Sequence, residues 1–298
     1  MKKSYSAFSL ILMYMSVASA ADASDSKFDH AKPDTTHTWT EEEMKTATPM
    51  PLPIYEPQVQ PVEQQREKNA DLVQKSSPAV DLQPPYNPDI REQGEAKNLY
   101  SPNRDRHPFT QLGILYFDGP SGRSKCSGQF VNQNVVLTAA HCVRDKTTGE
   151  WYKNLRFEQS FPSTGKLYYF LPSCSSTSSS YVGSPGGQLD YAFLRVSNSI
   201  TGWMGLRINA SQIPVTVVGY QGLSLKAFNG FMMPNGSMHQ ITPNFLFGGS
   251  SGGAWVDMNT NQVVGSTHGG SANHLSSPVF GMELWNLFQT VSQSNPCK

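Results

Sequence analysis

Short apolar runs, separated by glycine, proline, serine and asparagine, fill most of the chain after about residue 106. Many short strands divided by turn residues are typical of an all-β sandwich or of barrels. Residues 173–187, which are rich in serine and glycine, predict a surface loop. The strands that we expect are 112–117, 127–131, 134–138, 167–171, 191–196, 215–220, 228–233, 254–257, 263–266 and 279–282.

The periodicity changes near the C-terminus. Leu284, Leu287, Phe288 and Val291 recur at the spacing of one helix face. A stripe of this kind buries itself against the rest of the protein. We therefore expect a C-terminal helix that lies on the second half of the core.

Residues 21 to about 98 differ in composition from the rest of the chain. They are rich in proline, glutamine and charged residues, and their apolar residues follow no fixed period. Such a stretch buries too little apolar surface to offset the entropy of ordering it. We expect a propeptide over residues 21–98, largely extended or disordered, with one short helix capped by Thr40.

The first twenty residues have the pattern of a signal peptide. Lys2 and Lys3 precede the apolar stretch 7–17, and Ala18-Ser19-Ala20 fits a small-residue cleavage site. No other segment reaches about 18 apolar residues. We expect a secreted or periplasmic mature protein without membrane contact; an uncleaved anchor is the alternative.

Charge narrows the classes of partner. The formal net charge is 0, and charged residues make up 15% of the 298 positions. This balance offers no electrostatic basis for binding nucleic acid or an anionic membrane.

The four cysteines are an even number in a chain that we expect to be exported, which favours disulfides. Four cysteines allow three pairings. Cys126 and Cys142 flank two short strands and can meet across a hairpin, which leaves Cys174 to join Cys297. The spacing of cysteine and histidine does not support a zinc site, and we expect no metal.

Two distant segments carry the candidate chemistry. His141 follows an apolar run and two alanines, and Ser251 lies in Gly249-Ser250-Ser251-Gly252-Gly253. Between them Asp190 opens an apolar strand, where it can be buried and accept hydrogen bonds. A serine needs a base to remove its proton, and the base needs an acid that orients it. The alternatives are a packed histidine beside a structural cysteine, a simple Gly/Ser turn, and a turn aspartate.

The glycines around Ser251 permit a sharp turn. The backbone N–H groups of Gly249 and Ser251 are candidates to face one oxyanion, and Ser250 is the rival nucleophile. Further along, His268 precedes Gly269 and Gly270. A glycine-rich strand edge can pair with an extended peptide, so His268 either lines a substrate pocket or is structural.

These motifs resemble those of trypsin-like serine proteases with the chymotrypsin fold. Residues 137–142 are similar to their histidine motif, 190–194 to their aspartate motif and 249–253 to their serine motif. The order His, Asp, Ser along the chain also agrees. The resemblance covers about 99–297 and implies two six-stranded antiparallel β-barrels, about 107–200 and 201–290, with the site between them.

Within that family the chain looks most like the bacterial glutamyl endopeptidases. Residues 102–107 resemble the opening of those mature enzymes, which implies cleavage of the propeptide near Asn98-Leu99. The resemblance also implies a substrate pocket formed by Leu246, Thr267, His268, Gly269 and Gly270. Three departures bear on function. Ser250 replaces the aspartate with which trypsins pair their new N-terminus, while Thr267 and Leu246 replace pocket residues that would favour glutamate. No acidic residue stands at the expected pocket position before Ser251, so a basic substrate residue is not favoured either.

The sequence therefore predicts an exported, monomeric serine endopeptidase, made as a preproprotein, that acts on proteins or peptides without a cofactor. Its domain would span residues 99–298. Two alternatives stay open: an inactive binding protein on a protease scaffold, and an esterase using the same three residues.

Overall fold

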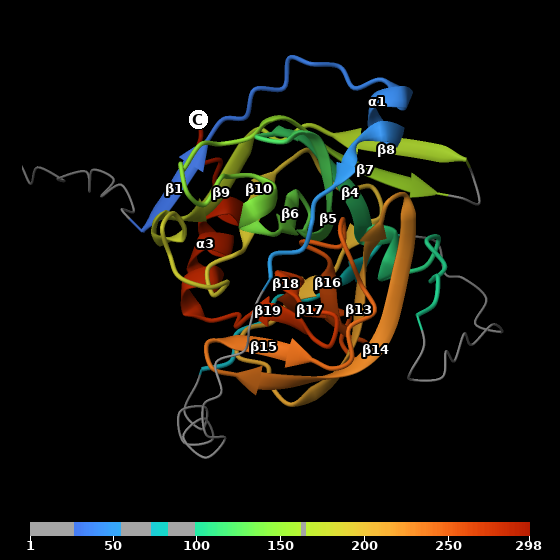
Figure 1. Cartoon of the computed structure of the whole chain (residues 1–298), viewed down its shortest axis with the longest axis vertical. Helices are drawn as coiled ribbons and strands as arrows, with labels where there is room; N and C mark the ends of the chain where they lie inside the picture. Colours follow the sequence, from blue (N-terminus) through green and yellow to red (C-terminus); the bar gives the residue numbers. More distant parts are fainter. Residues whose placement is uncertain (1–26, 55–72, 83–98, 162–164) are drawn as a thin grey trace, which may run out of the picture.

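Two β-sheets dominate the computed structural model, which describes residues 27–54, 73–82, 99–161 and 165–298 (Figure 1). The predicted signal peptide (residues 1–20) and Asn98 of the predicted cleavage site lie outside these ranges. The first sheet has the strand order β1-β9-β10-β6-β5-β4-β7-β8, and β2 also pairs with β5. Its strands are β1 (Phe28–Ala31), β2 (Thr48–Pro49), β4 (Leu112–Gly119), β5 (Gly122–Asn132), β6 (Val135–Thr138), β7 (Lys153–Phe161), β8 (Lys166–Phe170), β9 (Cys174–Ser178) and β10 (Ala192–Arg195).

The second sheet has the order β12-β17-β16-β13-β14-β15-β19-β18. Its strands are β12 (Gly205–Leu206), β13 (Ile213–Gln221), β14 (Ser224–Asn235), β15 (Met238–Ile241), β16 (Ala254–Asp257), β17 (Gln262–Ser266), β18 (Gly269–Gly270) and β19 (Leu275–Pro278). A separate pair joins β3 (Val80–Asp81) to β11 (Gly202–Trp203). The all-β class is confirmed. The first sheet is widened by β1 and β2, which come from the N-terminal segment.

Helices are few in the part of the chain that the structure describes. They are α1 (Glu41–Thr46), α3 (Met282–Gln293) and the short 3-10 helices η1 (Phe109–Gln111), η2 (Ala140–Cys142) and η3 (Ser179–Tyr181). The predicted cap of α1 is confirmed, because the Thr40 side chain accepts from the backbone N–H of Glu43. No described helix combines the length and the apolar character needed to cross a bilayer.

The C-terminal helix is confirmed, and its predicted face is the buried one. Its location is not the predicted one, because α3 contacts β9 and β10 of the first sheet. The Phe288 ring packs on Phe193 of β10, and Arg195 of β10 donates to the carbonyl oxygen of Val291. Position along the chain does not reveal which sheet offers the complementary apolar surface.

Two segments differ from the predicted strands and loops. Residues 279–282 are not a strand: β19 ends at Pro278, and α3 begins at Met282. Residues 173–187 are not a simple surface loop, because β9 occupies 174–178 with every side chain buried. Serine has little strand propensity, but β9 lies between β1 and β10, and their backbone hydrogen bonds determine its conformation.

Both expected disulfides are present. Cys126 of β5 is bonded to Cys142 of η2, directly after His141. Cys174 of β9 is bonded to Cys297, which ties the end of the chain to the first sheet.

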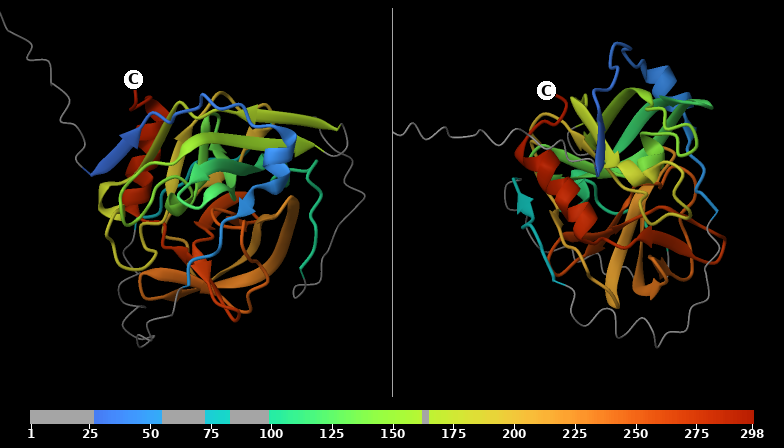
Figure 2. Two further views of the ribbon diagram at one scale, coloured as in Figure 1. Left: turned by 45° about the horizontal axis from the view of Figure 1, so that its top comes forward. Right: turned by 90° about the vertical axis from the view of Figure 1, so that its left-hand side faces the viewer.

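The N-terminal segment packs more closely on the domain than its composition suggests. Phe28 and Trp39 are buried, and the Trp39 indole N–H donates to the carbonyl oxygen of Asn154 at 2.7 Å. Phe28 and Trp39 contact residues of the downstream domain, so the composition of the N-terminal segment alone does not reveal this packing. Figure 2 shows this segment, in blue, running over the first sheet.

Candidate active site

His141, Asp190 and Ser251 come from three separate elements. η2, which follows β6, carries His141, and Asp190 lies two residues before the start of β10. Ser251 lies in the turn before β16 of the second sheet. Because β6 and β10 are paired neighbours, the first two side chains emerge together at one end of the first sheet. Ser251 faces them from the other sheet.

The three side chains form a continuous hydrogen-bonded chain. His141 Nδ1 lies 2.6 Å from Asp190 Oδ2, and His141 Nε2 lies 2.8 Å from Ser251 Oγ. The backbone N–H of His141 also donates to Asp190 Oδ1 at 2.8 Å. An ionised carboxylate only accepts, so Nδ1 carries the proton and Nε2 is left to accept from the serine hydroxyl. The histidine is thereby oriented as a base for Ser251.

Asp190 is buried and bonded to two histidines. His268 Nδ1 lies 2.5 Å from the same Oδ2 that receives His141. Burial raises the pKa of the Asp190 carboxyl, but the charges and hydrogen bonds of His141 and His268 outweigh it and hold the pKa well below its usual range. Asp190 is therefore a fixed negative charge beside the base.

Ser127 of β5 holds the serine turn against the first sheet. Its hydroxyl donates to the carbonyl oxygen of Gly249 at 2.9 Å and accepts from the N–H of Tyr220 at 2.7 Å. Its N–H donates to the carbonyl oxygen of Ser251 at 2.8 Å. A single small residue next to Cys126 thus joins both sheets at the site, and no sequence motif pointed to it.

Glycine is required on both sides of Ser251. Gly249 and Gly252 have φ values of 92° and 79°, which L side chains rarely adopt. A Cβ at Gly252 would also lie 2.4 Å from the carbonyl oxygen of Ser127. These two glycines make the turn on which the serine is presented.

The expected pocket residues divide into two groups. Leu246 is fully buried in the apolar cluster of the second sheet, and the Thr267 hydroxyl accepts from the Trp255 indole at 3.1 Å. Both side chains are thus engaged in packing. His268 lies beside the triad, and the Gly270 N–H donates to the carbonyl oxygen of Pro53 at 2.9 Å.

A cavity of about 330 Å³ lies beside His141 and Asp190. Its lining residues include His141, Asp190 and His268, together with Pro53 and Ile54 of the N-terminal segment. The position of Pro53 and Ile54 beside the site was not predicted from the sequence, which indicated only a propeptide here. The proline alternation in 49–53, which is typical of extended backbone, is the signal that could have directed attention to it.

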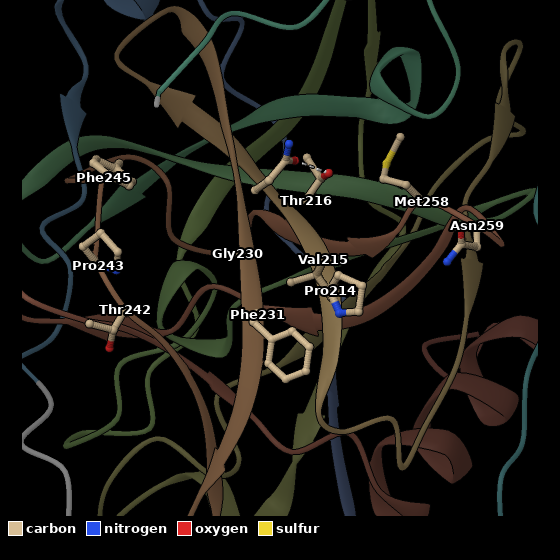
Figure 3. Close-up of a pocket in the computed structure, with 11 residues that line it drawn as sticks. Pro214, Val215, Thr216, Gly230, Phe231, Thr242, Pro243, Phe245, Met258 and Asn259 are labelled. Carbon is tan, nitrogen blue, oxygen red and sulfur yellow. Dashed lines mark hydrogen bonds between the residues drawn. The ribbon is translucent and has the colours of Figure 1, made fainter. Parts of the chain in front are cut away.

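A second hollow, of about 710 Å³, lies on the second sheet (Figure 3). Pro214, Phe231 and Phe245 are among its lining residues, and none of the three triad residues lines it.

One group of side chains has the arrangement of metal ligands. Atoms of His141, Asp190 and His268 lie within 4.8 Å of one another. The Nδ1 atoms of both histidines are already hydrogen-bonded to Asp190. In a second group, Cys126, His141 and Cys142, the two cysteines are joined in a disulfide and offer no thiolate.

Comparison with known proteins gives one match to a family sequence model and several structures of similar fold. The sequence model of the trypsin-like peptidase domain matches residues 126–265. No curated protein sequence matches the chain significantly. Among solved structures, protease Anisep from Arthrobacter nicotinovorans is similar at 20% identity and a TM-score of 0.58, covering 66% of this chain and 100% of that one.

Two further structures are similar at low identity. A Glu endopeptidase is 18% identical with a TM-score of 0.58, covering 67% of this chain and 99% of that one. The thermostable serine protease AL20 from an extremophilic microorganism is 22% identical with a TM-score of 0.53, covering 62% of this chain and 98% of that one. At this identity the likeness establishes the fold.

Proposed function

Because this chain carries a trypsin-like peptidase domain, we propose that it is an exported serine endopeptidase that acts through Ser251, His141 and Asp190. The observation that carries the proposal is the single chain of hydrogen bonds from Asp190 through His141 to Ser251. A packed histidine or a simple Gly/Ser turn would not require it.

The proposed reaction has two half-reactions. Ser251 Oγ attacks the substrate carbonyl carbon while His141 Nε2 takes the hydroxyl proton, and Asp190 stabilises the resulting imidazolium. The N–H groups of Gly249 and Ser251 stabilise the oxyanion, and His141 then protonates the leaving amine as the C–N bond breaks. Water attacks the acyl-enzyme by the same route, which restores Ser251 and releases the acid.

The proposed function includes export and two proteolytic cleavages. Residues 1–20 direct export to the periplasm or medium, and cleavage near Asn98-Leu99 releases a monomeric domain of residues 99–298. N-terminal sequencing of the exported protein tests both cleavages. A mature protein that begins near residue 21 and is fully active would overturn the propeptide assignment.

The activity is tested by digesting a peptide library with the exported, processed protein and with its Ser251→Ala variant. We expect cleavage by the first and none by the second, together with labelling of Ser251 by a fluorophosphonate. Cleavage of esters without peptides would favour the esterase. An absence of both, in folded and processed protein, would favour the inactive binding protein.

A further inference from the structure

Residues 48–54, hereafter the cleft segment, bridge the two sheets at the active site. Thr48 and Pro49 form β2, which pairs with Ser124 and Lys125 of β5. At its other end, Pro53 accepts from the Gly270 N–H of β18. Figure 1 shows this part of the chain, in blue, descending from α1 across the junction between the sheets.

The cleft segment occupies a donor that the proposed reaction needs. The Gly249 N–H donates to the carbonyl oxygen of Met50 at 2.8 Å. Met50 is held in that position, because its own N–H donates to the carbonyl oxygen of Lys125 at 2.9 Å. A substrate oxyanion and the Met50 carbonyl cannot use the same N–H at once.

Absent side chains allow this close approach. A Cβ on Gly269 would lie 2.1 Å from the carbonyl oxygen of Pro53, and one on Gly248 would lie 3.2 Å from that of Met50. The glycine-rich edges of the site are therefore covered by backbone of this same chain. This is how an extended peptide adds to a strand edge.

Side chains of the cleft segment are also engaged. Leu52 is half-buried against the apolar cluster of the second sheet that contains Leu246. Pro53 and Ile54 are among the residues that line the cavity beside His141. Apolar residues of the cleft segment thus border the space next to His141 and Asp190.

The composition of the cleft segment suits a bound, extended chain. Pro49, Pro51 and Pro53 alternate with Met50 and Leu52. Proline fixes φ and restricts the preceding residue to extended conformations, so little conformational entropy is lost on binding. Of the residues between the prolines, Met50 supplies a backbone N–H and Leu52 an apolar side chain for contacts with the two sheets.

We propose that the cleft segment is an intramolecular inhibitor that occupies the substrate cleft and withholds the Gly249 N–H from the reaction. The inference rests on the proposed peptidase function and deepens it, because it also names the ligand class of the cleft. That class is an extended peptide with an apolar side chain, in the position of Leu52, against the second-sheet cluster.

The test uses the full-length chain and the rate at which a fluorophosphonate labels Ser251, followed by intact mass spectrometry. Leu52→Glu places a charge against the apolar cluster and should release the cleft segment. We expect labelling to become about tenfold faster or more, since one oxyanion donor is worth about 10²–10³ in rate. Leu52→Ala, a milder change, should give a smaller increase.

The matched control is Leu82→Glu, which adds the same charge at an exposed leucine of the N-terminal segment, away from the cleft. It should label at the parent rate, and Ser251→Ala should not label. Thermal melting confirms that each variant is folded. A synthetic peptide of residues 47–54, added to Leu52→Ala, should slow labelling again, whereas its Leu52→Glu counterpart should not.

The two proposals fail in different ways. Equal, rapid labelling of the parent and both Leu52 variants overturns the inhibitor and leaves the peptidase reading standing. Absence of labelling in every folded variant overturns the peptidase function, and the inhibitor with it. Failure of the peptide to slow labelling of Leu52→Ala also overturns the inhibitor.

Discussion

Asp190 is bonded to three donors, and each acts on a different part of the site. The His141 ring is oriented by Oδ2, the His141 backbone is held by Oδ1, and His268 adds a second imidazole to Oδ2. An amide in place of the Asp190 carboxylate keeps the shape of the side chain but removes its negative charge. Because an amide can present a donor where the carboxylate only accepts, this change tests how His141 is oriented.

For Asp190→Asn we expect kcat/KM on a peptide substrate to fall about 10⁴-fold, because the amide favours the wrong tautomer of His141. The processed protein and the variant are compared on one peptide, with circular dichroism as the measure of folding. Asp145→Asn is the control, since the Asp145 carboxylate accepts from the backbone N–H groups of Thr147 and Thr148, which are not part of the triad. A loss below about tenfold would mean that Asp190 does not orient the base.

A buried histidine, His239, makes the stability of the fold depend on pH. His239 of β15 is buried, Nδ1 has no hydrogen-bond partner among the described residues, and burial lowers its pKa to about 4. Between this value and the unfolded pKa of about 6.5, the unfolded chain binds a proton that the folded chain does not. Falling pH therefore destabilises the fold across this window.

We expect His239→Leu to remove up to about 1.4 kcal/mol per pH unit from the slope of unfolding free energy against pH, between about 4 and 6.5. Urea unfolding at several pH values measures the slope. His37→Leu, a half-buried histidine outside the sheets, is the comparison. An unchanged slope in His239→Leu would show that His239 has the same pKa in the folded and the unfolded protein.

At the scale of elements, the site lies where the two sheets meet. β5 provides the connection, because Ser127 bonds to the serine turn and to β13 while Cys126 is joined to the helix that carries His141. α3 stabilises the other end of the same sheet through β9 and β10, and Asp190 comes just before β10. Packing of this helix therefore supports one wall of the site.

Leu287→Ala on the buried face of α3 should lower the free energy of unfolding by about 2–5 kcal/mol, because the side chain is fully buried and leaves a cavity. Met282→Ala, at 39% exposure in the same helix, should cost far less. Urea denaturation of the two variants gives the comparison. Similar losses for both would mean that α3 does not depend on its apolar face.

At the scale of the whole molecule, covalent links act over very different lengths of chain. Cys126–Cys142 closes a separation of 16 residues, and Cys174–Cys297 closes one of 123. In the chain-entropy description, a longer closed loop restricts the unfolded ensemble more.

Replacing Cys174 and Cys297 by serine should lower the unfolding free energy by about 5 kcal/mol, against about 3 kcal/mol for Cys126 and Cys142. Equilibrium denaturation of the two double variants tests the order. A larger loss for Cys126 and Cys142 would mean that packing of those fully buried residues outweighs loop entropy.

Local sequence determined much of this protein. Turn residues between short apolar runs identified the β-rich domain, the spacing of Leu284, Leu287, Phe288 and Val291 identified α3, and the motifs pointed to His141, Asp190 and Ser251. These features depend on neighbours within a few positions, so periodicity, capping and turn chemistry carry them.

Tertiary structure decided what depends on partners distant in sequence. The serines of β9 form a buried strand because β1 and β10 flank them, and α3 lies on the first sheet because its complementary surface is there. Likewise Ser127, the second histidine on Asp190, and Met50 at the Gly249 N–H have roles that their own segments do not encode. Hydrogen bonds and burial between remote segments are set only when the chain folds, which is why these parts of the site escaped prediction.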